Sequence, residues 1–199
     1  MARPPLYDDA LRSRLLAAAT DLVEHNGVAA IALREVAAAA DTSTSAVYTL
    51  FGGKTQLVAA VMDAAFASFG AAQRAAAPDG LRALGIAYRT WALAHPELYR
   101  MMFSAPGASA PDEGSGGADR EPDASDLAMA PLQEAIARAQ RAGGMADVPV
   151  GIAATAIWGQ VHGIVSLQLA GLGPAGLDWD AAYTTVLDTI TRAWSPPTP

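Results

Sequence analysis

The residues best suited to chemistry are Tyr48 and Lys54, which flank the end of a segment of small polar side chains. A tyrosine hydroxyl donates a hydrogen bond and a lysine ammonium carries a positive charge, so both suit an anionic partner such as a phosphate. Lys54 is the only lysine in the chain, and it stands at the expected start of a helix, where the helix dipole disfavours a cation. A bound anion would remove that conflict. We therefore treat this segment as a candidate phosphate-binding site.

Residue spacing predicts two short helices joined by a tight turn around this site. The first spans about residues 33–40 and turns its apolar residues inward. The second spans about residues 44–50 and follows Asp41-Thr42-Ser43, where Ser43 can cap the helix. Such a pair, with small polar side chains on the second helix, is typical of a helix-turn-helix. Small side chains let that helix enter a major groove about 12 Å wide, and its free N–H groups suit a phosphate.

The segment resembles the DNA-binding domain of the TetR family of transcriptional regulators over about residues 9–69, with the motif at 32–51. The resemblance rests on Val36-Ala37, Asp41-Thr42-Ser43, Val47, Tyr48, Phe51, Gly52-Gly53, Lys54 and Leu57. It implies that Tyr48 and Lys54 contact DNA phosphates. The residues that it implies face DNA are Thr42, Ser43, Thr44, Ser45, Ala46 and Thr49.

Three positions depart from the pattern of the family. Asp41 stands where glycine is common, Leu50 where histidine or another aromatic residue is common, and Ala32 where threonine caps the helix before the turn. The implied fold and role survive these changes. The DNA sequence that a relative reads cannot be carried over.

The formal net charge of −7, from 13 basic and 20 acidic residues, at first argues against a nucleic-acid partner. Residues 105–126 hold six acids and one arginine, however, which leaves only −2 for the rest of the chain. That segment lacks large apolar side chains and is rich in Pro, Gly and Ser, so we expect a mobile acidic loop. Residues 1–60 carry five basic and six acidic side chains, which predicts few phosphate contacts. Their sources would be Lys54 and the arginines Arg3, Arg12, Arg14 and Arg34.

The 199 residues predict an all-α protein, because 47 are alanine, the best helix former, and apolar residues recur at helical spacing. Helices are expected at about 8–25, 33–40, 44–50, 54–77, 80–94, 96–103, 126–142, 148–170 and 179–194. The start signals are Ser43, Asp79, Pro96, Ser125 and Asp178, and the stop signals are Gly27, Gly143-Gly144 and Gly171. We expect a DNA-binding domain at 9–69 and a ligand-binding and dimerisation domain at 70–194.

Beyond residue 70 the chain resembles the WHG-type ligand-binding domain of part of the TetR family, through Trp91, residues 95–99 (HPELY) and residues 158–163 (WGQVHG). Trp158 and His162 lie four residues apart and share one helical face. His162 is either a core histidine held by a hydrogen bond or a direct ligand contact. Bulky residues set among alanines favour a cavity for an apolar or aromatic compound. The candidate ligand-binding residues are Phe66, Tyr88, Trp91, Tyr99, Met102, Phe103, Trp158 and His162.

The last two predicted helices carry apolar faces, and the resemblance implies that they form a four-helix interface in a homodimer. Two-fold symmetry would place two recognition helices about 34–36 Å apart on a palindromic DNA operator. A ligand entering near Trp91, Tyr99 and Trp158 would move the helix at 54–77 and so release the DNA. The resulting hypothesis is a ligand-responsive transcriptional regulator, with repression the commoner behaviour in the family.

Other classes of function find less support. Residues 171–176 (GLGPAG) match a dinucleotide-binding pattern but follow a helix and contain proline, and Gly53-Lys54-Thr55 lacks the first glycine of a P-loop. The chain has no cysteine, its three histidines lie far apart, and no acid–base pair can be built, so we expect no enzyme activity, cofactor or metal. No uninterrupted apolar run is long enough to span a membrane, which favours a cytoplasmic protein without membrane contact. The alternative left open is a helical adaptor that binds only proteins.

Overall fold

The structure, a computed structural model, describes residues 9–104 and 124–196 and is all-α over these ranges, as predicted. The helices are α1 (Asp9–Asn26), α2 (Leu33–Ala39), α3 (Thr44–Phe51), α4 (Lys54–Ala76), α5 (Leu81–Ala94), α6 (Pro96–Ser104), α7 (Ala124–Arg141), α8 (Val150–Leu169) and α9 (Trp179–Ala193). Two 3₁₀ turns, η1 (Val28–Ala30) and η2 (Ala77–Asp79), precede α2 and α5. Each predicted helix is confirmed to within two residues at either end.

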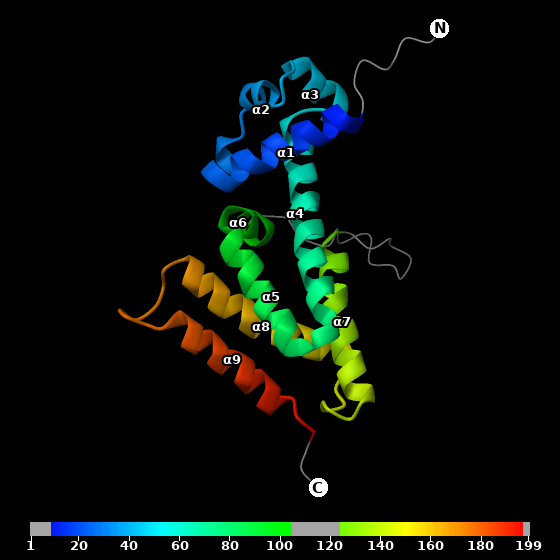
Figure 1. The fold of residues 1–199 in the computed structure, drawn as a ribbon, viewed down its shortest axis with the longest axis vertical. Coiled ribbons are helices and arrows are strands. Elements are labelled where there is room, and N and C mark those ends of the chain that lie inside the picture. Colours follow the sequence, from blue (N-terminus) through cyan, green and yellow to red (C-terminus); the bar gives the residue numbers. More distant parts are fainter. Residues whose placement is uncertain (1–8, 105–123, 197–199) are drawn as a thin grey trace. The chain divides into compact units, whose positions relative to one another are not determined.

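The first compact unit contains α1, α2, α3, the start of α4, and α6, that is, the described residues within Met1–Phe66 and His95–Ala118. In Figure 1, α1, α2 and α3 (blue to cyan) gather around the start of α4. Their apolar stripes share one core because each helix buries a single face. The fully buried side chains of this core include Leu15, Val23, Ile31, Val36, Val47, Leu57 and Val61.

The corner between α5 and α6 is tied to α1 within the first unit. The Nδ1 atom of His95 lies 2.6 Å from Oε1 of Glu24, and α6 packs along α1. This grouping differs from the predicted domains, in which α6 falls in the second domain. The predicted boundary near residue 70 therefore stays a prediction.

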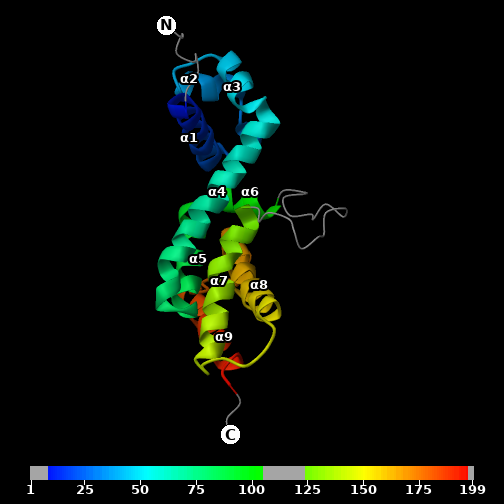
Figure 2. The same ribbon diagram turned by 90° about the vertical axis from the view of Figure 1, so that its right-hand side faces the viewer.

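The second compact unit contains the rest of α4 with α5, α7, α8 and α9, that is, the described residues within Ala67–Ala94 and Asp119–Pro199. Figure 2 shows α7 and α8 side by side, and α8 also packs on α5 and α9. The tightest approach is at Gly85, where an added Cβ would lie 2.5 Å from a methyl group of Leu187. The hydroxyl of Tyr183 donates a hydrogen bond to the carbonyl of Gly85. Glycine at this position therefore lets α5 and α9 meet.

The predicted start signals have mixed outcomes. Asp178 caps α9 as predicted, because its carboxylate accepts hydrogen bonds from the N–H groups of Asp180 and Ala181 at 2.9 and 3.0 Å. Asp79 as the cap of α5 is wrong, since it lies within η2 and Gly80 directly precedes the helix. Ser43 occupies the N-cap position of α3 but makes no side-chain hydrogen bond there, so its predicted capping bond is wrong.

Part of the predicted acidic loop is also corrected. Residues 124–126 belong to α7, which starts at Ala124 rather than after Ser125. Residues 105–123 and Arg3 lie outside the described residues.

Two helical segments, Lys54–Asp79 and Val150–Leu169, are long and apolar enough on average to cross a membrane. Neither segment is an uninterrupted apolar run, the criterion used for the sequence, because polar residues such as Asp63 and His162 interrupt them. Core helices of soluble proteins meet the same criterion of length and composition.

Candidate nucleic-acid interface and internal cavity

The exposed surface of α3 is built from small hydroxyl side chains and one aromatic ring. Ser43, Thr44, Ser45 and Thr49 are exposed, and Tyr48 keeps 60% of its surface accessible. Ala46, predicted to face DNA, is fully buried, because it shares the inward face of the helix with Val47; that prediction is wrong. Thr42 is half-buried at the turn. The structure therefore places the remaining predicted residues on or beside one solvent-facing surface.

The turn from α3 to α4 fixes how Tyr48 and Lys54 are presented. Gly52 and Gly53 have φ values of +87° and +135°, backbone conformations that residues other than glycine rarely adopt. A Cβ on Gly53 would lie 3.5 Å from the ring of Tyr48, so the ring rests against this turn. Lys54 follows as the first, exposed residue of α4. The two glycines thus hold a hydroxyl donor and a cation at the same edge.

The turn between α2 and α3 departs from ordinary backbone geometry at Asp41. Its φ of +51° makes it the one positive-φ residue other than glycine in the described ranges. The N–H of Thr42 donates to the carbonyl of Ala37, and that of Asp41 donates to the carbonyl of Ala38, at 2.9 and 3.1 Å. This is the pattern of a Schellman cap, whose left-handed position favours glycine. This geometry gives a physical reason for the glycine that the resemblance leads one to expect at position 41.

We expect Asp41→Gly to raise the free energy of unfolding by about 0.5–1 kcal/mol, and Asp41→Val to lower it by about 1–2 kcal/mol, because valine cannot adopt this φ without strain. Urea denaturation at a fixed protein concentration measures both changes. Asp63→Gly, an exposed substitution inside α4, is the matched control and should lower the free energy by about 1 kcal/mol. A loss of stability in Asp41→Gly equal to that of the control would contradict this account of the turn.

Basic side chains near this surface are few. Arg12 places its guanidinium carbon 4.7 Å from the ring centre of Phe51, which holds the charge against the first unit. Arg14, Arg34 and Lys54 are exposed. Helices α1 to α4 of this unit therefore offer up to four cations per chain, while the fifth described cation of the unit, Arg100, pairs with Glu97.

The second unit contains a cavity of about 330 Å³ that is partly open to solvent, near the lower end of the range for small-molecule sites. Apolar side chains from α5, α7, α8 and α9 form most of its wall, and α4 contributes Gln73. The larger apolar residues in the wall are Leu81, Leu84, Leu132, Met145, Ile157, Val161, Leu187, Ile190 and Trp194. An uncharged, largely apolar compound suits this lining.

Tyr88 and Trp158 line the cavity, and His162 contacts Tyr88 without lining it. His162 Nδ1 is 3.0 Å from the hydroxyl of Tyr88, and its Nε2 is 3.3 Å from Oγ of Ser166. The indole N–H of Trp158 donates to the Tyr88 hydroxyl at 3.4 Å. Burial lowers the pKa of His162 below its ordinary value of 6.5, so the neutral ring can accept a hydrogen bond from the Tyr88 hydroxyl at Nδ1 and donate one to Ser166 from Nε2. His162 thus positions Tyr88 through a hydrogen bond.

The other candidate ligand-binding residues lie elsewhere. Phe66, Tyr99, Met102 and Phe103 belong to the first unit, where the ring centres of Phe66 and Tyr99 lie 6.2 and 4.9 Å from that of Phe103. Placing these four in the cavity is wrong, since they pack among the helices of that unit. Trp91 lines a shallow groove on α4 and α5 and donates to Ser68 at 3.1 Å.

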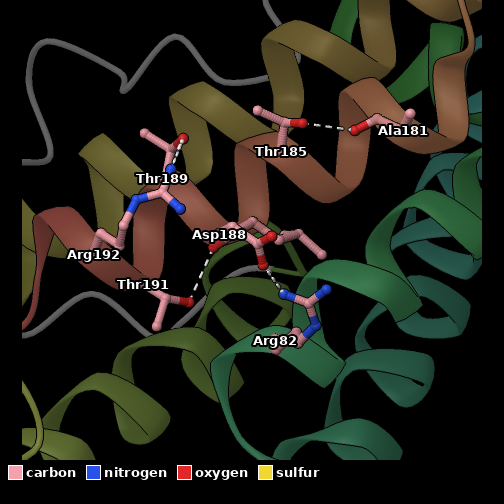
Figure 3. A network of polar contacts seen from close by, with 8 residues as sticks. Arg82, Ala181, Thr185, Asp188, Thr189, Thr191 and Arg192 are labelled. Carbon is pink, nitrogen blue, oxygen red and sulfur yellow. Dashed lines mark hydrogen bonds and ion pairs between the residues drawn. The ribbon is translucent and has the colours of Figure 1, made fainter.

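Charged groups at the cavity are paired or face solvent. Figure 3 shows Arg82 of α5 reaching the carboxylate of Asp188 on α9, with 2.5 Å between Nη1 and Oδ1. The hydroxyl of Thr191 donates to the carbonyl of Leu187 at 3.0 Å. Asp79 at the wall is exposed. The interior of the cavity therefore offers no unpaired charge from the residues described.

Sequence reasoning missed Gln73, which is the only buried polar or charged residue among those described. A signal existed, because Phe66, Phe69 and Gln73 recur at helical spacing on the apolar stripe of α4. A polar residue on such a stripe calls for a partner.

One face of α8 is apolar and uncovered by the rest of the described chain. Ile152 and Leu167 are 60% and 47% exposed, and both lie on this face. Gly159 and Gly163 lie between them, and an added Cβ at either would meet no atom within 4 Å. Packing within one described chain therefore gives no reason for glycine at these positions.

Comparison with known proteins gives two matches to family models. Residues 15–61 match the model described as bacterial regulatory proteins, tetR family, and residues 81–190 match the tetracyclin repressor-like C-terminal domain. The second match alone covers more than half of the chain. No protein with a curated description matches.

Solved structures share the fold over nearly the whole chain. A protein of unknown function from Rhodococcus sp. RHA1 is 28% identical, with a TM-score of 0.77 over 97% of this chain and 100% of that one. A TetR family transcription regulator from Marinobacter aquaeolei VT8 is 21% identical, with a TM-score of 0.65 over 94% and 97%. RolR, solved in complex with resorcinol, is 18% identical, with a TM-score of 0.63 over 95% and 89%.

Proposed function

The chain belongs to the TetR family of bacterial regulatory proteins, and from that premise we propose that it is a repressor that binds a palindromic operator as a homodimer and releases it when a small apolar or aromatic ligand binds. TetR family regulators are DNA-binding transcription factors without enzyme activity. The observation that carries the proposal is the exposed hydroxyl surface of α3, flanked by Tyr48 and Lys54. An adaptor that bound only proteins would have no need for a small polar surface with a phosphate contact at its edge.

In this proposal, the DNA-facing residues are Thr42, Ser43, Thr44, Ser45 and Thr49. Tyr48, Lys54 and Arg34 contact phosphates. Helix α3 enters the major groove, where short side chains let its backbone approach the bases.

Dimerisation is assigned to α8 and α9. The uncovered glycines of α8 support close packing against a second copy, because they leave room for a helix to approach. Exposed Ile152 and Leu167 on the same face supply apolar surface for that contact. A dimer is needed because two α3 helices related by a two-fold axis read the two half-sites of a palindrome.

The ligand site is assigned to the cavity at Tyr88 and Trp158, and RolR, a protein of the same fold, is solved with resorcinol. Helix α4 begins at Lys54 and ends in the wall of this cavity, so a ligand that displaced α4 would shift Lys54. Linkage makes the effect reciprocal. We would measure ligand affinity with and without an operator recovered from a random DNA pool. The proposal expects weaker binding to the DNA complex, and equal affinities would contradict release by the ligand.

We expect a shallow dependence of operator affinity on salt, because at most a few cations per subunit reach phosphates. The logarithm of affinity should fall linearly with the logarithm of salt concentration. The magnitude of the slope should correspond to a few phosphate contacts per subunit and stay below about eight for a dimer. Fluorescence anisotropy of a labelled operator over a range of potassium chloride concentrations gives this slope. A value above about eight would show that more cations contact DNA than Arg12, Arg14, Arg34 and Lys54 provide.

A further inference from the structure

Gln73 is a buried amide at the wall of an apolar cavity. Only 4% of its surface is exposed, and it lies on the last two turns of α4. A primary amide has two hydrogens to donate and an oxygen that accepts two hydrogen bonds, so burial is costly when these groups lack partners.

The contacts of Gln73 leave its oxygen available. Within residues 9–104 and 124–196, its amide makes one hydrogen bond, in which Nε2 donates to the carbonyl of Leu84 at 3.5 Å. That distance is long for a hydrogen bond. Because the Leu84 carbonyl can only accept, the amide nitrogen must point to it, and the oxygen points elsewhere. Every fully enclosed polar atom of the described side chains has a partner, so Oε1 of Gln73 borders open space.

Most other polar side chains at the cavity are engaged, while Asp79 faces solvent and the indole N–H of Trp194 can only donate. The Tyr88 hydroxyl meets His162 and Trp158, Arg82 meets Asp188, and Thr191 donates within α9. Gln73 is therefore the polar side chain of the described wall that is best placed to accept a hydrogen bond from a bound molecule.

Resting on the proposed function, we propose that Gln73 selects neutral apolar ligands that carry a hydroxyl or similar donor, by accepting a hydrogen bond from that donor. A hydrocarbon of the same shape would leave Oε1 desolvated without a partner. The negative charge of a carboxylate ligand would be repelled by the partial negative charge on Oε1 of Gln73. Such a ligand would also find no unpaired cation in the described wall. Since Gln73 belongs to α4, a ligand held in this way contacts the helix that begins at Lys54 directly.

The test uses three probes of one shape: 2-naphthol, naphthalene and 2-naphthoate. Isothermal titration calorimetry on the full-length protein should give at least about tenfold tighter binding of 2-naphthol than of naphthalene, and weaker binding of 2-naphthoate than of 2-naphthol. In Gln73→Met, which keeps the length of the side chain, 2-naphthol should lose about tenfold in affinity, while naphthalene binds as well or better. Gln133→Met, on an exposed position of α7, is the matched control and should leave all affinities unchanged.

Several outcomes would overturn the inference: no binding of 2-naphthol by the wild type, tighter binding of 2-naphthoate, or a naphthol preference that survives in Gln73→Met. Thermal unfolding of each variant establishes that it is folded. Operator binding of Gln73→Met without ligand, expected within about twofold of wild type, separates the two proposals. If the probes do not show the expected affinities but the wild-type protein binds an operator, only the role of Gln73 is overturned. If the wild-type protein binds no operator at all, the proposed function is overturned.

Discussion

Substituting Tyr48→Ala together with Lys54→Ala should weaken operator binding by at least about 100-fold. Hydrogen bonds to charged groups contribute about 1.5–3 kcal/mol each, and a dimer loses two such contacts in each subunit. Both side chains are exposed, so neither substitution disturbs the core of the first unit. Anisotropy with a labelled operator measures the loss, while light scattering and calorimetry follow dimerisation and probe binding, which should not change.

Two controls sharpen this result. Tyr48→Phe keeps the aromatic ring against Gly53 and removes only the hydroxyl, so its loss should be a fraction of that of the double variant. Arg74→Ala removes an exposed cation from the other end of α4 and should leave operator affinity nearly unchanged. If the double variant instead lost dimerisation, the adaptor interpretation would gain support.

A second large effect is expected from Gly159→Leu on α8. A Cβ added at Gly159 meets no atom of the described chain within 4 Å, and leucine is a better helix former than glycine by up to about 1 kcal/mol, so the subunit should stay folded. A two-fold interface receives the new side chain twice in a closely packed helix contact. Each copy should destabilise the dimer by about 1–3 kcal/mol through overpacking. We expect the dimer dissociation constant to rise by about 100-fold and operator binding to fall with it.

Analytical ultracentrifugation over a range of protein concentrations measures this change. Ala75→Leu adds the same side chain at an exposed position of α4 and should leave the dimer intact. Leu167→Glu provides a second, independent disruption of the same face. If Gly159→Leu dimerised with wild-type affinity, the assignment of α8 to the dimer interface would be contradicted.

The helices could be predicted from the sequence because their signals are local. Apolar spacing sets the buried face of each helix, while Pro96, Asp178 and the glycine turns mark its ends. The helical period also held information that the family resemblance obscured. Ala46 is adjacent to Val47 on the inward face of α3, so treating residues 42–46 as a uniformly exposed run led to the error at Ala46.

The cavity could not be predicted in the same way, because its wall is formed where five helices meet. The candidate aromatic residues share a composition but not a location: Tyr88 and Trp158 line the cavity, whereas Tyr99 and Phe103 pack in the first unit. Helical spacing identifies which face of a helix is buried and leaves open which helix it meets. The capping bond of Ser43 failed for a similar reason, since it depends on a side-chain rotamer that the residue type does not determine.

The most direct test of the account is selection of bound fragments from a random pool of double-stranded DNA by the full-length protein. We expect enrichment of a palindrome whose half-site centres lie one helical turn apart, about 10 base pairs, or a multiple of it, with no enrichment by the Tyr48→Ala, Lys54→Ala variant. A pool that stays random after repeated rounds with the wild-type protein, or that yields the same sequences with the double variant, would contradict the account.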